Sequence, residues 1–421
     1  MNIVQFHDSD KPDVRHLLLA ADVSKARLDV YGRYTQAGVR YELMDSFLND
    51  LPTVHAKLDD YARQACALGY RGLALVVEPS GCYEKKLTQA AIRKGHTVWM
   101  VNPERMYKAG VLHHGDDGKS DPLDGQVLHM MARMGKVSRM VELASHWQQL
   151  RQLGQWLEDC TLSAADARIR LGEVRRALFC DYHQSTDLSW GATGRSIQAC
   201  YGFDPWKITS GSYGEFVATI RAHNVGVPER GLAGIWQQAL QSRMAELGES
   251  QRTLIGEQLE YIWQAWKRQE HRKQQLREQM VGITRNLSDQ EWLPPIFPGF
   301  TEVMRAKILA ETGPLQQFPH WRALVAYAGL KIRMRQSGKY RGRDKITKKG
   351  RILLRKHLGQ AAFTLARKDR VLGPYYHRKR AEGMPPRKAK VACMRKLLKM
   401  LYGASKSGQA FSSQRMYHCA G

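Results

Sequence analysis

The sequence predicts an α/β domain over residues 1–145, a helical arm over 146–290 and a basic, mainly α-helical domain over 291–421. Three observations support this division. Short apolar runs alternate with helix-like segments in the first third, long polar-rich helical stretches fill the middle, and Lys and Arg gather in the last third. With 43% hydrophobic and 9% aromatic residues in 421, the chain can build two or three globular domains.

The first domain shows four strand-like runs and one helix. The run GLALVV is short, apolar and typical of a buried strand, and TVWMV is stopped by Asn102-Pro103. The helix ends at Gly95, a natural C-cap. The predicted strands are 16–21, 28–31, 72–77 and 97–101, and the predicted helix is 83–94. This alternation favours an α/β sheet.

The middle region predicts two long helices, 146–178 and 235–283, joined by a Gly-rich insert at about 181–234. Helical spacing connects Ile255, Leu259, Ile262 and Trp266, and a seven-residue interval connects Leu240, Leu247, Leu254 and Tyr261. These patterns are compatible with an antiparallel coiled coil. Trp263 and Trp266 are interpreted as packing residues rather than platforms for bases. The region indicates a spacer or a dimerisation arm.

The last region carries almost all of the net charge of +25, with 29 Lys and Arg against 6 Asp and Glu from residue 291 onward. A near-neutral body with a basic end indicates a polyanion partner, and a membrane surface is a weaker alternative. The region opens with Pro294-Pro295 as a linker. A Pro-Gly turn at 298–299 and an amphipathic helix ending at Gly313 then resemble a helix-hairpin-helix unit, whose turn amides face a phosphate.

Four carboxylates of the first domain form a candidate site. Asp22 and Glu78 each follow a predicted buried strand, and Asp121 and Asp124 share one face at the start of a predicted helix. Such a set suits Mg²⁺, which prefers oxygen ligands. Alone, Asp121 and Asp124 are better explained as a helix cap and a dipole partner, and Asp22 and Glu78 as solvent-facing strand ends. Their chain order favours a nuclease site. The neighbouring His113, His114, Asp116 and Asp117 are interpreted as a polar loop.

A second constellation spans Lys331 to Leu358, with twelve basic residues against the single acid Asp344 and with Ser337-Gly338 in a turn. Arg335 and Lys339 flank the serine and could stabilise charge if its hydroxyl attacked a phosphate. From the residues alone, Ser337 is better explained as a turn residue, and the cations as ligands of backbone phosphates. The expected nucleic-acid-binding residues are Arg333, Arg335, Lys339, Arg341, Arg343, Lys345, Lys348, Lys349, Arg351 and Arg355.

Both ends of the chain resemble the DEDD transposases of the insertion-sequence one-ten family, which includes the Piv invertase and the bridge-RNA-guided recombinases. At the N-terminus the resemblance lies in AADVSKARLDVYG, VVEPSGCYEKKL, WMVNPERM and KSDPLDGQVL. At the C-terminus it lies in PGFTEVMRAKILAETG, FPHWRALVAYAGL, RQSGK, ITKKGRILLRKHL and the tail at 390–398. Ser120 and Gly125 depart from it, standing where Thr and Ala are commoner, and the middle insert is longer than expected.

The resemblance implies a RuvC-like (RNase H-like) fold, a coiled-coil arm and a transposase domain. It matches Asp22, Glu78, Asp121 and Asp124 to the family's Mg²⁺ ligands, and Ser337 to a serine implicated in a covalent phosphoserine link to DNA. The resemblance therefore favours a nucleophile at Ser337 over a turn residue. It likewise favours metal binding by Asp121 and Asp124 over a helix cap and a dipole partner. The implied partners are donor and target DNA, a noncoding bridge RNA and further copies of the chain, from dimer to tetramer.

Two other function classes compete with this one. A RuvC-type junction nuclease would use the same carboxylates with water as nucleophile, and would have no need of the serine turn. A non-catalytic architectural factor would need none of the carboxylates. The seven scattered cysteines support neither a disulfide framework nor a zinc site, and the polar N-terminus does not resemble a signal peptide. We expect a cytoplasmic bacterial protein that associates with the nucleoid when active and does not bind membranes.

Overall fold

The computed structural model describes most of the chain and forms two compact units. Unit 1 comprises residues 1–152 and 280–421, and unit 2 comprises 153–279. The described ranges are 3–5, 12–114, 121–183, 189–223, 226–244, 247–287, 299–333, 336–337, 340–341, 345–368 and 370–408.

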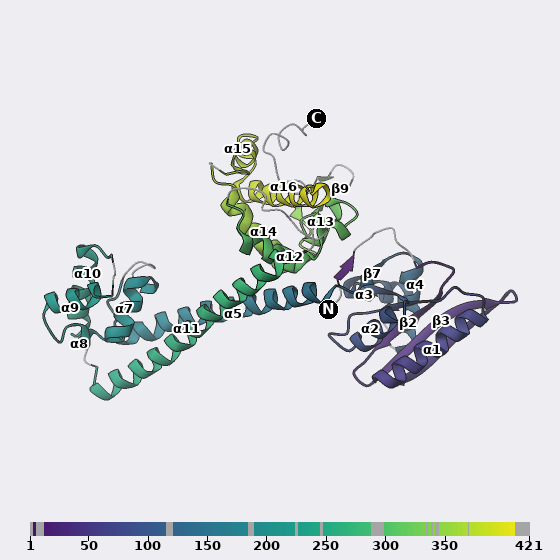
Figure 1. The fold of residues 1–421 in the computed structure, drawn as a ribbon, viewed down its shortest axis with the longest axis horizontal. Coiled ribbons are helices and arrows are strands. Elements are labelled where there is room, and N and C mark those ends of the chain that lie inside the picture. Colours follow the sequence, from purple (N-terminus) through teal and green to yellow (C-terminus); the bar gives the residue numbers. More distant parts are fainter. Residues whose placement is uncertain are drawn as a thin grey trace. The chain divides into compact units, whose positions relative to one another are not determined.

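The N-terminal part of unit 1 is a seven-stranded mixed sheet with helices on both faces (Figure 1). Its strand order is β1-β7-β6-β5-β2-β3-β4. β2, β3 and β4 form an antiparallel meander, whereas β5 and β6 run parallel to β2. β7 pairs antiparallel with β6, and β1 pairs antiparallel with β7 at the far edge. The strands are β1 (Ile3–Gln5), β2 (Leu17–Val23), β3 (Arg27–Gln36), β4 (Val39–Leu48), β5 (Leu73–Val77), β6 (Thr97–Val101) and β7 (Val137–Val141).

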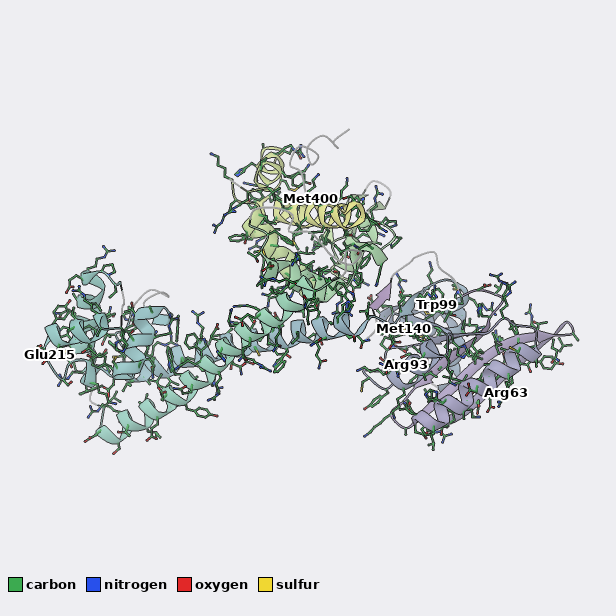
Figure 2. The ribbon with its side chains drawn as sticks, in the orientation of Figure 1. Arg63, Arg93, Trp99, Met140, Glu215 and Met400 are labelled. Carbon is green, nitrogen blue, oxygen red and sulfur yellow. The ribbon has the colours of Figure 1, made fainter. Side chains whose placement is uncertain are left out.

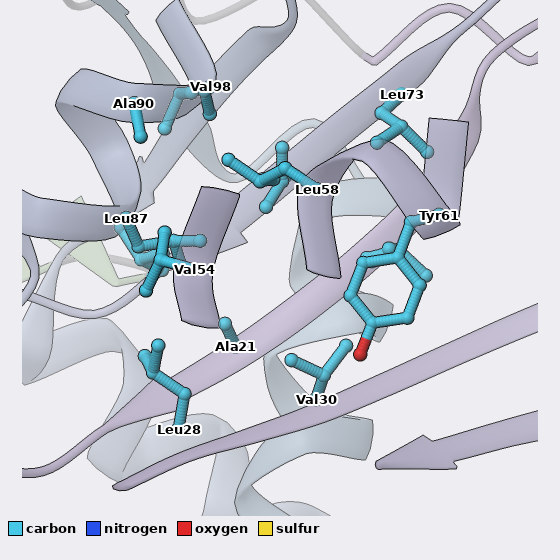
Figure 3. Close-up of a cluster of buried hydrophobic side chains, with 14 of the residues drawn as sticks. Ala21, Leu28, Val30, Val54, Leu58, Tyr61, Leu73, Leu87, Ala90 and Val98 are labelled. Atoms are coloured by element: carbon cyan, nitrogen blue, oxygen red, sulfur yellow. The ribbon is translucent and has the colours of Figure 1, made fainter. Parts of the chain in front are cut away.

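Each face of the sheet has its own hydrophobic core, because side chains alternate along a strand. One face carries Leu17, Leu19 and Ala21 of β2 and packs against α1 (Leu51–Ala67) and α2 (Lys85–Arg93). Figure 3 shows this cluster, in which Val54 and Leu58 of α1 lie near Ala21 and Leu87. The opposite face carries Leu18 and Ala20 and packs against α3 (Pro103–His114) and α4 (Asp121–Arg133).

The structure confirms the mixed sheet with helices that the strand-like runs predict. All four predicted strands and the helix before Gly95 are present, and Gly95 adopts the left-handed backbone, φ +83°, that ends a helix. The elements that the sequence analysis does not predict include β4 and α1. β4 is an edge strand with mostly exposed side chains, and α1 follows it directly, capped by Asp50.

Unit 2 contains most of two long helices, α5 (Ser145–Leu178) and α11 (Glu249–Arg285). The first residues of α5 and the last residues of α11 belong to unit 1. The packing cluster of the pair comprises Ala164, Ala167, Leu171, Leu178, Leu259, Ile262, Trp263 and Trp266. Intervals of three and four residues in this cluster place its members on one face of each helix. The predicted packing of Trp263 and Trp266 is confirmed, since they are only 4% and 6% exposed.

Two expectations for this region are wrong. The predicted helix 235–283 is two helices, because α10 (Glu229–Ser242) ends before α11 begins. The seven-residue pattern is not a packing seam of the pair either. Leu240, Leu254 and Tyr261 are 41%, 67% and 74% exposed, because they lie on the outer side of their helices.

The Gly-rich insert folds as a small helical body rather than a loop. Its helices are α7 (Ala192–Tyr201), α8 (Pro205–Ile208), α9 (Tyr213–Arg221) and α10. Aromatic side chains dominate its core, with Phe179, Tyr182, Phe203 and Phe216 all buried. Ser212 and Glu215 form a capping box that fixes the start of α9.

The C-terminal part of unit 1 is mainly helical, as predicted. The helix before Gly313 is α12 (Glu302–Thr312), capped by Thr301. Pro294, Pro295 and Pro298 lie outside the described residues, so the helix-hairpin-helix expectation stays a prediction. The other helices are η1 (Leu315–Gln317), α13 (Trp321–Tyr327), α14 (Ile352–Leu365), α15 (Gly373–Ala381) and α16 (Pro386–Ser407), and two-residue strands β8 to β11 lie between α13 and α14. None of the described helices is long and apolar enough to cross a membrane.

Candidate functional site

Asp22 and Glu78 lie at the same edge of the sheet, on neighbouring parallel strands. The last paired residues of β2 and β5 are Ala21 and Val77, and Asp22 and Glu78 come directly after them. Adjacent strands lie about 4.8 Å apart, which brings the two backbone positions close together. Both residues are half-buried. The carboxyl ends of these strands therefore place two acids side by side.

The alternation of side chains also assigns these acids to one face. Ala20 and Val76 belong to the core beneath α4, whereas Ala21 and Val77 belong to the core on the other side. Asp22 and Glu78 follow in the α4 register. The Asp22 carboxylate accepts a hydrogen bond from the Val23 amide at 2.8 Å. The face that carries the two acids is thus the face that α4 covers.

Helix α4 begins with the remaining two predicted acids, Asp121 and Asp124. Its contact with β3 is close. A Cβ atom on Gly125 would lie 2.8 Å from the Cβ of Tyr31, and Tyr31 is the register partner of Ala20. Glycine at position 125 therefore lets the first turn of α4 pack directly on the strands that end in the acids. Asp124 is half-buried, and the side chain of Asp121 lies outside the described residues.

Tyr31 leaves no space for a larger side chain at position 125. The Tyr31 hydroxyl donates to Glu42 at 2.8 Å, and burial together with this bond raises the pKa of Tyr31 to about 12. His129, one turn further along α4, contacts the Tyr31 ring edge-on at 5.8 Å. Glu42 therefore fixes the hydroxyl of Tyr31 and His129 contacts its ring, while the Tyr31 Cβ occupies the space that a methyl group at position 125 would need.

A further acid at this edge is missed by the sequence reasoning above. Asp29 of β3 is the direct register partner of Asp22 and is also half-buried. It alternates with Leu28 and Val30, which face the other core, so it shares the α4 face with Asp22. The signal was available in RLDVY, where a polar residue stands between buried apolar ones.

The donor set is chemically suited to a hard cation, because it consists of carboxylates alone. Among the described side chains, however, no three His, Cys, Asp or Glu are arranged to hold a metal ion. The side chain of Asp121 lies outside the described residues, so this statement covers three of the four predicted ligands, Asp22, Glu78 and Asp124. Asp116, Asp117 and the side chains of His113 and His114 likewise lie outside the described residues.

Ser337 lies in a short hairpin of the basic segment. β9 (Gln336–Ser337) pairs antiparallel with β10 (Tyr340–Arg341), and Ser337 is the register partner of Tyr340. The serine is thus the last residue of β9, and residues 338–339, which link it to β10, lie outside the described residues. Only its backbone is described.

The base of the segment is fixed by backbone bonds. Strand β8 (Ile332–Arg333) pairs with β11 (Lys345–Ile346), and the Arg351 amide donates to Tyr327 O at 2.9 Å. Thr347 N likewise donates to Lys331 O at 2.8 Å. The hairpin with Ser337 therefore extends from a closed, hydrogen-bonded base.

The predicted phosphate-binding cations divide into two groups. Arg333, Lys345, Lys348 and Lys349 have exposed side chains, and Lys349 forms an ion pair with Glu104 of α3. Arg351 and Arg355 are engaged by the fold, because Arg351 pairs with the buried Glu311 at 2.9 Å and Arg355 donates to Ala328 O at 3.1 Å. The side chains of Arg335, Lys339, Arg341 and Arg343 lie outside the described residues.

Comparison with protein families bears on the C-terminal part of the chain. Residues 296–377 match the model described as "Transposase IS116/IS110/IS902 family". The chain thus carries a transposase domain of this kind at its C-terminus, and such a domain implies DNA as substrate.

Two other comparisons complete the picture. The chain is similar to a structure titled "Thermus thermophilus RuvC structure", with 16% sequence identity over 29% of this chain and 99% of that chain, and a TM-score of 0.23. Comparison with curated proteins finds no significant match.

Proposed function

We propose that this protein is the transposase of an insertion sequence, and that it cuts and rejoins DNA with Ser337 as nucleophile and Mg²⁺ as cofactor. The observation that carries the proposal is the transposase-domain match, which includes the hairpin with Ser337. The register of β2 and β5 supports the second half of the site, because it places Asp22 and Glu78 at one edge.

In this proposal Asp22, Glu78, Asp121 and Asp124 hold Mg²⁺. When bound, the cation neutralises charge on the phosphate that reacts. Asp121 and Asp124 belong to the first turn of α4, and the partial positive charge of a helix N-terminus attracts anionic side chains to that position.

The role of Ser337 is to conserve the phosphodiester bond energy. Its Oγ attacks phosphorus, an O–P bond forms, and the bond from phosphorus to the leaving deoxyribose oxygen breaks. The serine proton ends on that oxygen through solvent. In the reverse direction a hydroxyl of another strand attacks the phosphoserine, regenerates serine and joins the strands. Exposed cations of the same segment, such as Lys348 and Lys349, hold the neighbouring phosphates.

The proposed partners are those implied by the resemblance to the insertion-sequence one-ten transposases. A bridge RNA that pairs with donor and target DNA would leave sequence recognition to base pairing, and copies of the chain would assemble as a dimer or tetramer. The exposed apolar side chains on the arm support assembly. Leu162 and Ile169 of α5 are 58% and 64% exposed, and Leu254 and Tyr261 of α11 are similarly open.

The test is recombination of a plasmid that carries the element ends, with purified protein, Mg²⁺ and the RNA transcribed beside the gene. Asp22→Asn and Glu78→Gln should abolish strand cleavage while the affinity for DNA and RNA stays within about twofold, because both variants keep the size of the side chain. The matched control is Asp13→Asn, which alters an exposed acid before β2. Near-normal recombination by Asp22→Asn would exclude the metal site, and RNA-free protein recombining at full rate would exclude the guide.

A further inference from the structure

The last long helix, α16, carries a concentration of charge that the segment around Ser337 does not include. Its 22 residues contain seven Lys and Arg and no Asp or Glu. The buried side of the helix is apolar and includes Cys393, Leu397 and Met400, the last of which is labelled in Figure 2. The inner side of the helix is thus committed to the core. Of the cations, Lys390, Arg395 and Lys396 are half-buried, and the exposed ones are Arg387, Lys388, Lys399 and Lys406.

Four of these cations form one stripe. Lys388, Arg395, Lys399 and Lys406 follow one another at intervals of seven, four and seven residues, which keeps them within a narrow sector of the helix. Small residues, Ala392 and Gly403, stand between them on the same side. At 1.5 Å per residue the stripe is about 27 Å long, the length of roughly eight base pairs of duplex.

Four lysines of α16 lie over aromatic rings. Lys406 lies over Tyr402 of the same helix, and the other three rings each belong to a different neighbouring helix. Lys390 Nζ lies 4.5 Å from the centre of the Phe363 ring of α14, and Lys396 Nζ lies 5.9 Å from that of Tyr375 of α15. Lys399 Nζ lies 5.5 Å from the ring centre of Trp321 of α13. These contacts restrict long side chains that would otherwise be free, so less entropy is lost when they meet a phosphate.

No acid neutralises the stripe within the described part of the chain. Lys388, Arg395, Lys399 and Lys406 form no ion pair there, and Glu382, the acid that precedes the helix, is bound by Arg378 and Lys379 of α15. A row of uncompensated cations of this density favours a polyanion.

We infer that the outer face of α16 binds the sugar-phosphate backbone of duplex DNA, as a second contact surface separate from the Ser337 segment. A straight row of cations matches the regular phosphate spacing of a duplex strand. Single-strand surfaces need ring faces on which bases stack, and here a lysine lies over each of the three rings. The small residues within the stripe let the backbone approach closely. The face supplies affinity and orientation, without reading sequence.

The inference rests on the proposed function only in taking DNA as the substrate, and its test needs no strand cleavage. Binding of the full-length protein to a 20-base-pair duplex is measured by fluorescence anisotropy from 50 to 300 mM salt without Mg²⁺. The variant is Lys388→Gln with Lys399→Gln. The control is Arg63→Gln with Arg93→Gln, which removes two exposed cations of the sheet domain, whose side chains are 76% and 68% exposed (Figure 2).

Each phosphate contact contributes about 0.9 to the slope of log K against log salt, so the α16 variant should lose about 1.8 from the magnitude of the slope. Its Kd at 100 mM salt should rise roughly tenfold or more, and the control should change neither value. Far-ultraviolet circular dichroism and the melting temperature check that both variants are folded. A duplex slope equal to that of the control overturns the inference. So does a loss confined to single-stranded DNA or to an RNA hairpin measured in parallel, which would assign the face to those partners. A failure here leaves the carboxylate and serine tests unaffected.

Discussion

Replacing Gly125 with Ala should uncouple activity from stability, because it displaces the start of α4. The added Cβ would lie 2.8 Å from the Tyr31 Cβ, whereas ordinary contact begins at 3.4 Å. Restoring that distance requires a shift of about 0.6 Å between α4 and β3, since Tyr31 cannot rotate its own Cβ away. Asp121 and Asp124 move with the helix.

The two effects have different magnitudes. Overpacking costs about 1–3 kcal/mol, and replacing a helical Gly with Ala returns about 1 kcal/mol, so the net loss of stability should be about 0–2 kcal/mol. Metal ligands tolerate displacements of only about 0.2 Å, and misplacing reacting groups by an ångström can cost about a hundredfold in rate. We therefore expect cleavage to fall by roughly ten- to a hundredfold.

The assay is single-turnover cleavage of a labelled element end, with urea unfolding measured on the same preparation. Gly172→Ala is the matched control, because a Cβ there meets nothing within 4 Å. It should raise stability by up to about 1 kcal/mol and leave the rate unchanged. Wild-type cleavage by a folded Gly125→Ala protein would refute the argument that α4 positions two of the four acids.

The remaining predictions address the same domains. Burial lowers the pKa of His129 from 6.5 to about 4, so the folded protein should lose up to about 3 kcal/mol as the pH falls from 6.5 toward 4. His129→Phe should make the free energy of unfolding nearly independent of pH over this range. If the variant keeps the wild-type slope of that free energy against pH, His129 is not the group responsible. Lys349→Ala should weaken DNA binding equally for all sequences and lower the salt slope by about 1, and a change in sequence preference would contradict this. Replacing Leu254 and Tyr261 with Gln should shift the assembly toward monomers in mass photometry, and an unchanged mass distribution would exclude the arm as an interface.

The sheet could be predicted where strands are buried on both sides. β5 and the first five residues of β2 are apolar and buried, so the sequence itself marks them, and the acids that follow these runs mark the edge. β4 could not be found this way, because an edge strand in contact with water carries no apolar run. Asp29 was missed for a related reason. Its importance depends on register with Asp22, and register is set by pairing across strands rather than within one.

In the helical arm, the spacing of apolar residues does not predict which face of a helix is buried. The seven-residue series with Leu254 and the series with Leu259 have the same kind of spacing, yet only the second is buried against α5. Spacing defines a stripe on a helix, but it does not say which stripe meets the neighbouring helix. The insert likewise folds around aromatic residues far apart in sequence, and its glycines obscured the helices between them.

The predicted role of Ser337 as a nucleophile depends on the family resemblance and hardly on the local sequence pattern. Ser337 ends the two-residue strand β9 in a segment with a hydrogen-bonded base, but a serine at such a position is common in proteins that have no nucleophile there. Neither spacing nor backbone geometry distinguishes a turn serine from an attacking one. Chemistry has to decide.

The most direct test of recombination by serine is to trap the protein on a suicide substrate, nicked so that the cleaved strand is released and cannot be rejoined. Wild-type protein with Mg²⁺ and RNA should form a protein–DNA adduct, and peptide mass spectrometry should place the link on Ser337. Ser337→Ala should bind the substrate with unchanged affinity and form no adduct. Cleavage by Ser337→Ala that yields free DNA ends would contradict the account and indicate a nuclease that uses water.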